Sequence, residues 1–367
     1  MKKLIRLFTA FIFFTYLLSV FSLSFAQEEN FNEAKSYEGI VLEVVEEREN
    51  ESGGYYQKLR VEIISNELQG QDFEVVNGLG DSPVTQKFKK GDRVVLSGYE
   101  DVSGNLNLFI DDYVRRGPML LLFFIFLVLS LIVAGKRGFT SFVGMILTFL
   151  MIYWLVLPMI SGGSNPIFVV LIFSIIAIPI TFYLSHGVNR KTNVAVVGTF
   201  ISLVITVVLS AIFVNWAKLT GFTTDEASFL QILKGGSFNM SGLLLAGIII
   251  GMLGVLDDVT VSQASVVFQL KNANKRMNFT ELYKRSMDVG KDHIASMINT
   301  LVLVYAGASL PLLLLFTDSS HTFAQVINYE IIASEVIRTL IGSIGLVLAV
   351  PVTTFIAVSI ADAEKEV

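Results

Sequence analysis

The residues best suited to chemistry lie on one stripe of a single apolar segment, residues 240–260 and the polar stretch that follows it. Intervals of three and four residues place seven side chains on one helical face, first small and then polar: Gly247, Gly251, Gly254, Asp258, Ser262, Ser265 and Gln269. Asp257 lies about 100° round the helix, on the flank of this stripe. Carboxylates in an apolar helix are costly and typically serve ion or proton transfer. The glycine half predicts close packing against another helix.

The two carboxylates also have a structural interpretation. They lie roughly 25 Å along the helix from Met240, which is close to where a bilayer-spanning segment ends. On this interpretation the span stops there, and Asp257 and Asp258 cap a following amphipathic helix. Both interpretations stay open at this point.

A second polar group opens the next apolar segment. Asp292 and His293 begin two adjoining helical faces. Further polar residues on these faces are Ser296, Asn299 and Thr300. Since both groups fall at the same end of their segments, Asp257, Asp258, Asp292 and His293 can share one membrane depth. Together they can hold a small cation or pass a proton, whereas acids that merely suit a helix N-terminus are the structural alternative.

No motif for catalysis or cofactor binding accompanies these residues. The sequence contains no HExxH, GxSxG or nucleotide-binding loop in a suitable context. The histidines His186, His293 and His321 lie in separate segments, so we expect no three-histidine metal site. We therefore predict a protein that is not an enzyme and holds no metal or cofactor.

The elements that position these residues are predicted to be membrane-spanning helices. Hydrophobic residues make up 53% of the 367 residues and charged residues only 16%, too few charges to coat a soluble globule of this size. Seven apolar stretches approach the roughly 20 residues that a bilayer requires, namely 117–135, 139–160, 166–185, 194–215, 240–260, 294–316 and 336–358. We predict an α-helical polytopic membrane bundle over residues 117–360.

The last predicted span combines a charged pair with small residues. Glu335 and Arg338 are spaced to pair with each other, and we interpret them as a structural pair. Gly342 and Gly345 continue the same stripe and predict close packing against a neighbouring helix.

The chain before the bundle is predicted to be exported. A basic start, the apolar run 7–23 and small residues at Ser24 and Ala26 indicate a signal peptide over residues 1–26, or an uncleaved anchor. Residues 27–116 contain five short alternating runs separated by turn signals, which predicts an all-β domain, a small closed barrel of OB or SH3-like type. This segment holds 10 basic and 19 acidic residues. Nucleic acid is therefore excluded as a partner, since its phosphates would be repelled.

The charges also predict the orientation. Eleven basic residues fall on one set of connections and the tail 361–367, and only Lys218 and Lys234 on the other set. Positive charge marks the cytoplasmic side, so the β domain is predicted outside the cell and the C-terminus inside. Within the basic set, residues 272–291 are interpreted as a solvated loop, with binding to anionic lipid as the alternative.

Three sequence runs resemble the YibE/YibF-like family of bacterial multi-pass membrane proteins. They are Gly242–Ala264 with its Leu-Asp-Asp-Val-Thr core, Gly290–Pro311, and Arg338–Thr354, and the Asn189-Arg190-Lys191 turn is similar as well. The resemblance implies an integral protein of the bacterial cell membrane without an established activity. It implies no site residues.

Two functional hypotheses follow. The first is a permease-like protein of unknown substrate, coupled to a cation or proton through Asp257, Asp258, Asp292 and His293. The second is a non-transporting membrane partner or assembly protein, whose β domain binds an external ligand or protein. Carboxylates that face a space between spans would favour the first hypothesis, and carboxylates that cap a helix would favour the second.

Overall fold

The computed structural model describes residues 35–49, 55–78, 86–100, 106–236, 238–317 and 322–363. The predicted signal peptide and most of the predicted tail lie outside these ranges. The chain divides into two compact units, Met1–Leu129 and Ser130–Val367.

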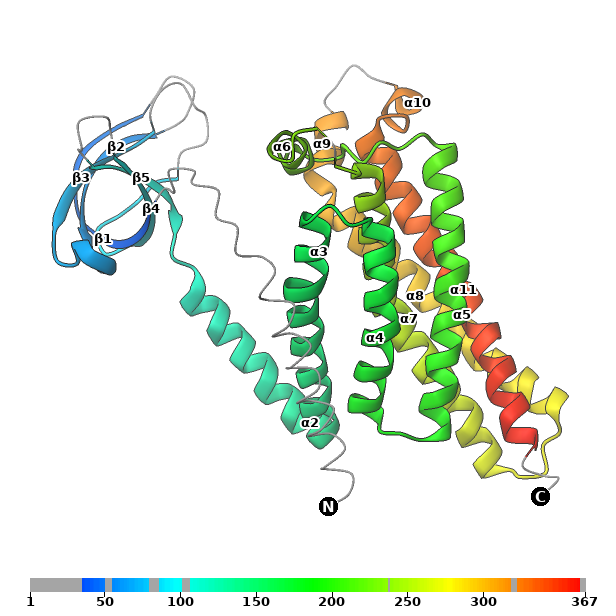
Figure 1. The fold of residues 1–367 in the computed structure, drawn as a ribbon. Helices are drawn as coiled ribbons and strands as arrows, with labels where there is room; N and C mark the ends of the chain where they lie inside the picture. Colours follow the sequence, from blue (N-terminus) through cyan, green and yellow to red (C-terminus); the bar gives the residue numbers. More distant parts are fainter. Residues whose placement is uncertain are drawn as a thin grey trace. The chain divides into compact units, whose positions relative to one another are not determined.

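The first unit contains one curled sheet of five antiparallel strands (Figure 1). The strands are β1 (Lys35–Glu49), β2 (Tyr55–Ile63), β3 (Asp72–Asn77), β4 (Arg93–Glu100) and β5 (Leu106–Tyr113), with a short 3-10 turn, η1, over Asn66–Leu68. Their order is β3-β2-β1-β4-β5. This confirms a five-stranded β domain. The predicted closed barrel is a half-barrel, because no hydrogen-bonded ladder joins β3 to β5 among the described strands, although the two edges are in contact.

The curl of the sheet follows from β1. This 15-residue strand pairs with β4 through its first half and with β2 through most of its length. Two register shifts against β2 bend it, as bulges do. On the inside of the curl, a Cβ added at Gly39 would lie 2.4 Å from the Val61 side chain. The chain therefore needs glycine there to bring the strands around the apolar core.

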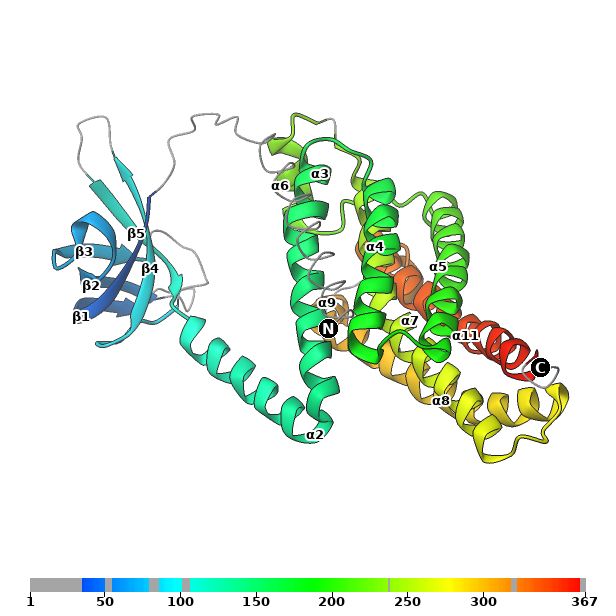
Figure 2. The ribbon, with the colours of Figure 1, turned by 60° about the horizontal axis from the view of Figure 1, so that its bottom comes forward.

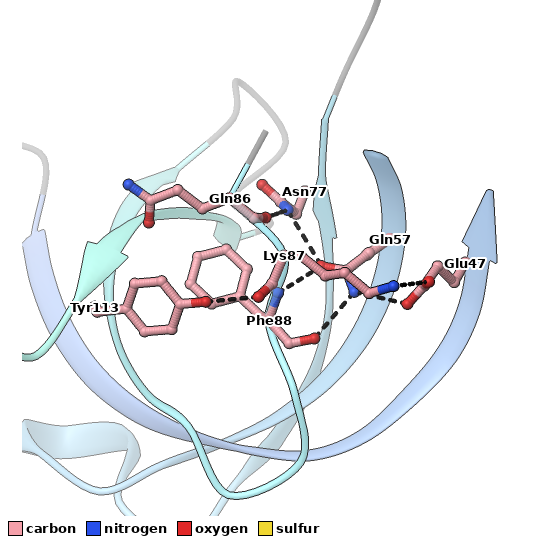
Figure 3. Close-up of polar contacts among 7 residues, drawn as sticks. All are labelled: Glu47, Gln57, Asn77, Gln86, Lys87, Phe88 and Tyr113. Atoms are coloured by element: carbon pink, nitrogen blue, oxygen red, sulfur yellow. Dashed lines mark hydrogen bonds and ion pairs between the residues drawn. The ribbon is translucent and has the colours of Figure 1, made fainter. Parts of the chain in front are cut away.

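A buried glutamine holds the segment before β4 against the sheet (Figure 3). The Gln57 Nε2 donates to the carbonyl of Phe88 at 3.0 Å, and its Oε1 accepts from the N–H of Phe88 at 2.8 Å. Nε2 also donates to Glu47 at 3.1 Å, and Glu47 pairs with Lys87 at 2.5 Å. The Tyr113 hydroxyl donates to the Lys87 carbonyl at 2.6 Å. The amide side chain thus acts as a strand partner, and the buried polar groups around it are satisfied.

The sheet continues into α2 (Arg116–Met151) through only two residues. The N–H of Val114 donates to the carbonyl of Arg93 at 2.9 Å. Arg116 at the start of the helix forms a two-armed pair with Glu38 of β1, with one arm at 2.7 Å. These bonds fix the direction in which α2 leaves the sheet.

The second unit is a helical bundle arranged around α7 (Met240–Ala273), as Figures 1 and 2 show. α7 packs against α4 (Pro166–His186), α5 (Arg190–Trp216), α8 (Phe279–Ala308) and α11 (Glu330–Ala363). Shorter helical pieces complete the unit: η2 (Ile152–Val156), α3 (Leu157–Ser161), α6 (Asp225–Leu233), α9 (Leu310–Thr317) and α10 (Phe323–Val326). The carboxylate pair lies on this central helix.

Fewer helices can cross a membrane than the seven predicted. In the described residues five are long and apolar enough, or six if α8 and α9, which meet at 66°, form one span. The predicted spans 117–135 and 139–160 belong to one helical stretch, Arg116–Ser161, broken only at Gly135 with φ 58° and ψ −135°. Three residues between the two apolar runs are too few to end a helix and start another through a loop, so the chain bends instead. The bundle is a membrane bundle as predicted, with a smaller count of spans.

The segment predicted as a solvated loop, residues 272–291, is largely helical. α7 runs unbroken to Ala273, and α8 begins at Phe279, where the Asn278 side chain accepts from a backbone N–H at 2.8 Å. The C-terminal ends of α7 and α11 and the N-terminal end of α8 lie together (Figure 2). Lys271 of α7 pairs with Asp362 of α11 at 3.0 Å. Because α7 is continuous, the two carboxylates do not cap a following helix, and that part of the structural interpretation is wrong.

Small residues bring α5 and α11 into close contact. A Cβ added at Gly198 would lie 2.5 Å from the Thr353 hydroxyl, and one at Gly345 would lie 2.5 Å from the Thr206 hydroxyl. Both threonines are fully buried. A Cβ added at Gly342 would lie 3.1 Å from the sulfur of Met252 in α7. The stripe that contains Gly342 and Gly345 is therefore a helix-packing surface.

The glycines of α7 differ from this arrangement. Gly247, Gly251 and Gly254 are exposed. No neighbouring atom in the described chain lies within 4 Å of a Cβ added at Gly247 or Gly254, and at Gly251 the nearest is the Tyr305 hydroxyl at 3.8 Å. Larger residues form the buried side of α7, among them Ile248, Ile249, Met252, Leu256 and Val259. The close packing predicted for the three glycines is absent from the described part of one chain, because α7 turns its bulkier side toward its neighbours.

Candidate functional site

Asp258 is the residue on which the site converges. It is exposed on the same face of α7 as the glycines. Its carboxylate interacts electrostatically with His293 on α8 and with His186 at the end of α4. Asp257, which is partly buried, interacts with Asp258. Side chains from three helices, two imidazoles and one carboxylate, thus lie within electrostatic range of one another.

Ser262, one turn beyond Asp258, links α7 to α8. Its Oγ lies 3.4 Å from the Nδ1 of His293 and donates to the backbone carbonyl of Asp258 at 2.7 Å. A separation of 3.4 Å is long for a hydrogen bond. The contact between Ser262 and His293 is therefore a weak link between α7 and α8. Of the other polar residues on the stripe, Ser265 donates to a carbonyl of its own helix at 2.8 Å, and Gln269 is exposed.

A buried contact among three helices sets the position of His293. The Gln263 Nε2 donates to the Ser286 carbonyl of α8 at 3.0 Å and to the Thr354 hydroxyl of α11 at 2.7 Å. Gly290 lies at this contact, where an added Cβ would meet a side chain of α11 at 2.5 Å. His293 follows Gly290 by three residues, so it lies on the same side of α8. The glutamine contact therefore fixes both the spacing and the rotation of α8.

His186 is positioned by the end of α4. The helix stops because Gly187 adopts φ 75°, and Asn189 then caps α5 by accepting from the N–H of Thr192 at 3.0 Å. The Asn189 amide also donates to the His186 carbonyl at 2.9 Å. The turn thus fixes the end of α4 at His186, which interacts electrostatically with Asp258.

The geometry suits proton transfer better than tight metal coordination. Among the described residues, Asp258, His186 and His293 form no direct salt bridge, and no three His, Cys, Asp or Glu side chains lie close enough together to hold a metal ion. Imidazole changes its charge near neutral pH. Ordered water can relay a proton between groups that do not touch.

The structure brings together only part of the predicted site. Of the predicted residues, Asp258 and His293 belong to the site, and Asp257 and Ser262 lie close to Asp258 on α7. Asp292 is exposed. The other polar residues predicted on this helix are also exposed, namely Ser296, Asn299 and Thr300. The Thr300 hydroxyl donates to a carbonyl of its own helix at 3.1 Å.

Sequence reasoning missed His186. Its separate segment argues against a three-histidine metal site, and no other role is predicted for it. Its position just beyond the predicted span 166–185 could have revealed it, because the predicted topology puts that end at the depth of Asp258.

The opposite end of the bundle carries polar contacts of a different kind. The predicted pair of Glu335 and Arg338 is present within α11 at 3.2 Å. Glu330, at the start of α11, accepts from the backbone N–H groups of Thr220 at 2.6 Å and Gly221 at 2.7 Å. These contacts tie the loop after α5 to α11 and are structural.

Comparison with known families covers both units. A family model described as YibE/F-like protein matches residues 122–363, more than half of the chain. A second model, described as YibE/F family N-terminal domain, matches residues 40–113. No curated protein and no solved structure matches the chain.

Proposed function

This membrane protein belongs to the YibE/F-like family, and we propose that it is permease-like and couples the passage of an unidentified solute to a proton or small cation. The observation that carries the proposal is the electrostatic interaction of Asp258 with His293 and His186, which come from two other helices. An ionisable group in an apolar helix is rarely retained without a role. Asp257 supplies a second carboxylate beside it, and we include Asp292 as an acidic group at the neighbouring surface.

The open face of α7 supports this proposal. The stripe that leads to Asp258 carries Gly247 and Gly254, and nothing in the described chain packs onto them. Small residues leave room for water or a small solute next to the helix. A carboxylate at the end of such a face is accessible from it, whereas a structural carboxylate would be covered by its partners.

We also propose the orientation. In the helical unit, cations gather at one end, at the Gly135 bend, the α4–α5 turn and the α7–α8 turn: Lys136, Arg137, Arg190, Lys191, Lys275 and Arg276. Lys218 and Lys234 follow the opposite helix ends. By the positive-inside rule the first end faces the cytoplasm of a bacterial cell, with the β domain outside the plasma membrane. Export through residues 1–26 is consistent with this orientation.

The proposal is tested by proton flux in proteoliposomes. Purified full chain is reconstituted with a pH-sensitive dye inside, and a potassium diffusion potential drives proton entry. We expect flux above that of empty liposomes, and a fall of about tenfold or more in Asp258→Asn, since a positioned proton-transfer group contributes at least that much.

The matched control is Asp288→Asn. Asp288 is an exposed carboxylate of α8 that pairs with Lys291 at 3.0 Å, and its loss should leave the flux unchanged. Equal flux in wild type and Asp258→Asn would contradict the proposed role of Asp258. Equal loss in both variants would point to a general effect of charge.

A second candidate function rests on the β domain. Tyr99 of β4 and Phe109 of β5 are 51% and 40% exposed, with ring centroids 6.2 Å apart. Exposed aromatic pairs are typical of protein interfaces. A non-transporting partner or assembly protein would use this pair. A photoreactive residue at Tyr99 should then crosslink to one defined protein in membranes, and one at the exposed Val45 should not. Both candidate functions are non-enzymatic.

A further inference from the structure

Two cations from separate helices lie within electrostatic range of each other at the basic end of the helical unit. Arg137 of α2 and Lys191 of α5 interact electrostatically, and both also interact with His186 at the end of α4. Within the described chain, Asp258 is the acidic group that interacts electrostatically with His186. Neither Arg137 nor Lys191 forms a salt bridge with an acidic side chain of the described residues. This leaves a local excess of positive charge.

A local contact between α2 and the end of α4 brings the two segments together. A Cβ added at Gly144 of α2 would lie 3.6 Å from the hydroxyl of Ser185 near the end of α4. Arg137 lies two helical turns before Gly144, on the same face. The chain continues past Ser185 in the direction of Arg137, and the turn capped by Asn189 places Lys191 at the same level. The two cations are therefore positioned by helix packing and by a capped turn.

The start of α5 adds to the positive potential. α5 is 27 residues long and begins at Arg190, one residue before Lys191. The first N–H groups of a helix have no partner within it, and the helix dipole is positive there. Asn189 satisfies one of them, the N–H of Thr192. Such a helix end with two cations beside it is suited to a phosphate group.

Exposed apolar residues lie within a few positions of the cations in the sequence and favour a lipid as the source of the phosphate. Ile132 and Val133, just before the Gly135 bend, are 74% and 85% exposed, and Val188 in the α4–α5 turn is 77% exposed. Free phosphate would gain nothing from these side chains. An acyl chain would cover them while the headgroup meets the cations.

We propose that Arg137, Lys191 and the start of α5 bind the phosphate headgroup of an anionic phospholipid, whose acyl chains lie against Ile132, Val133 and Val188. Basic sites between helices at the cytoplasmic side are suited to such lipids. The bound lipid neutralises the repulsion between the two cations and holds α2 to the α4–α5 turn. This site is separate from the proposed transport, and its test does not need transport.

The test is thermal stabilisation of the purified full chain in a neutral detergent. Tryptophan fluorescence reports unfolding of the helical unit, which contains both tryptophans, Trp154 and Trp216. Phosphatidylglycerol should raise the unfolding midpoint by about 5 °C, since a ligand that binds only the folded state stabilises it. Phosphatidylcholine and inorganic phosphate should not.

Matched double variants separate a site from general attraction. Arg137→Gln/Lys191→Gln should lose most of the shift, whereas Lys275→Gln/Arg276→Gln, which removes the same charge at the α7–α8 turn, should keep it. An unchanged shift in the first variant, equal loss in both, or a shift of the same size with inorganic phosphate would overturn the proposal. If the first variant does not fold, Arg137→Lys/Lys191→Arg should fold and keep the shift. Native mass spectrometry of the wild type should show retained phosphatidylglycerol, and its absence would also overturn the proposal.

Discussion

The polar clusters of the two units differ in how completely their side chains are hydrogen-bonded. In the β domain, Gln57 bonds both backbone groups of Phe88 and reaches Glu47, which is itself paired. In the helical unit, His186 and His293 approach Asp258 without a direct salt bridge among the described residues. The first cluster stabilises a fold. The second is costly in an apolar setting and contributes little to packing, so its residues are the better candidates for function.

The largest effect is expected where the polar cluster is structural. Gln57→Ala leaves the N–H and C=O of Phe88 buried without partners, and it should lower the free energy of unfolding of the β domain by about 3 kcal/mol. Pulse proteolysis of the full chain in urea, read from cleavage within the β domain, measures this change.

Two further variants sharpen this test. Asn77→Ala removes a bond to the carbonyl of Gln86 at the partly exposed edge of the same cluster, and should cost less than about 1 kcal/mol. Asp258→Asn should change the unfolding of the helical unit by less than about 0.5 kcal/mol. A cost for Asp258→Asn as large as that for Gln57→Ala would remove the contrast between the clusters.

A second prediction compares two glycines of the helical unit. An added Cβ at Gly345 would lie 2.5 Å from the Thr206 hydroxyl, so Gly345→Ala should destabilise the unit by about 2 kcal/mol. A Cβ added at Gly247 would have no neighbouring atom within 4 Å in the described chain. Gly247→Ala should therefore stabilise the helical unit by up to ~1 kcal/mol, because alanine has the higher helix propensity. Thermal unfolding in detergent, followed by tryptophan fluorescence, measures both. Equal destabilisation would show that the glycine face of α7 is packed as tightly as that of α11.

The smallest effect concerns acid and the β domain. A hydrogen bond from Arg115, together with one from the N–H of Tyr113, lowers the pKa of Asp112 to about 2. A pKa below the unfolded value of about 4 stabilises the domain at higher pH, and this contribution is lost as the pH falls from about 4 to 2. Asp112→Asn should make the urea midpoint for pepsin cleavage less dependent on pH in that window. An unchanged pH dependence would show that Asp112 does not contribute to acid sensitivity.

The sequence predicted the features that rest on local pattern. The alternation of residues located all five strands, and hydropathy located the apolar helices. Counting residues along two helices likewise predicts one membrane depth for Asp258 and His293, and this stays a prediction. These features depend on one segment at a time, which is why periodicity was sufficient.

Features that depend on neighbours were not predictable in this way. Hydropathy does not show that three residues near Gly135 make a bend, or that the polar residues 272–291 form a helical hairpin. Both faces of α7 are rich in small or apolar residues, so hydropathy does not distinguish them. Which face is buried depends on the positions of α5 and α11. His186 joins the site only because α4 lies next to α7, and no spacing in the sequence encodes that contact.

The central claim is that both histidines act through Asp258, and a double-mutant cycle on proton flux tests it most directly. His293→Gln and His186→Gln should each reduce flux in the wild-type background. In the Asp258→Asn background neither should reduce the residual flux further, because the group they serve is gone. The same fractional loss in both backgrounds would show that the histidines act independently of Asp258, and would contradict the account.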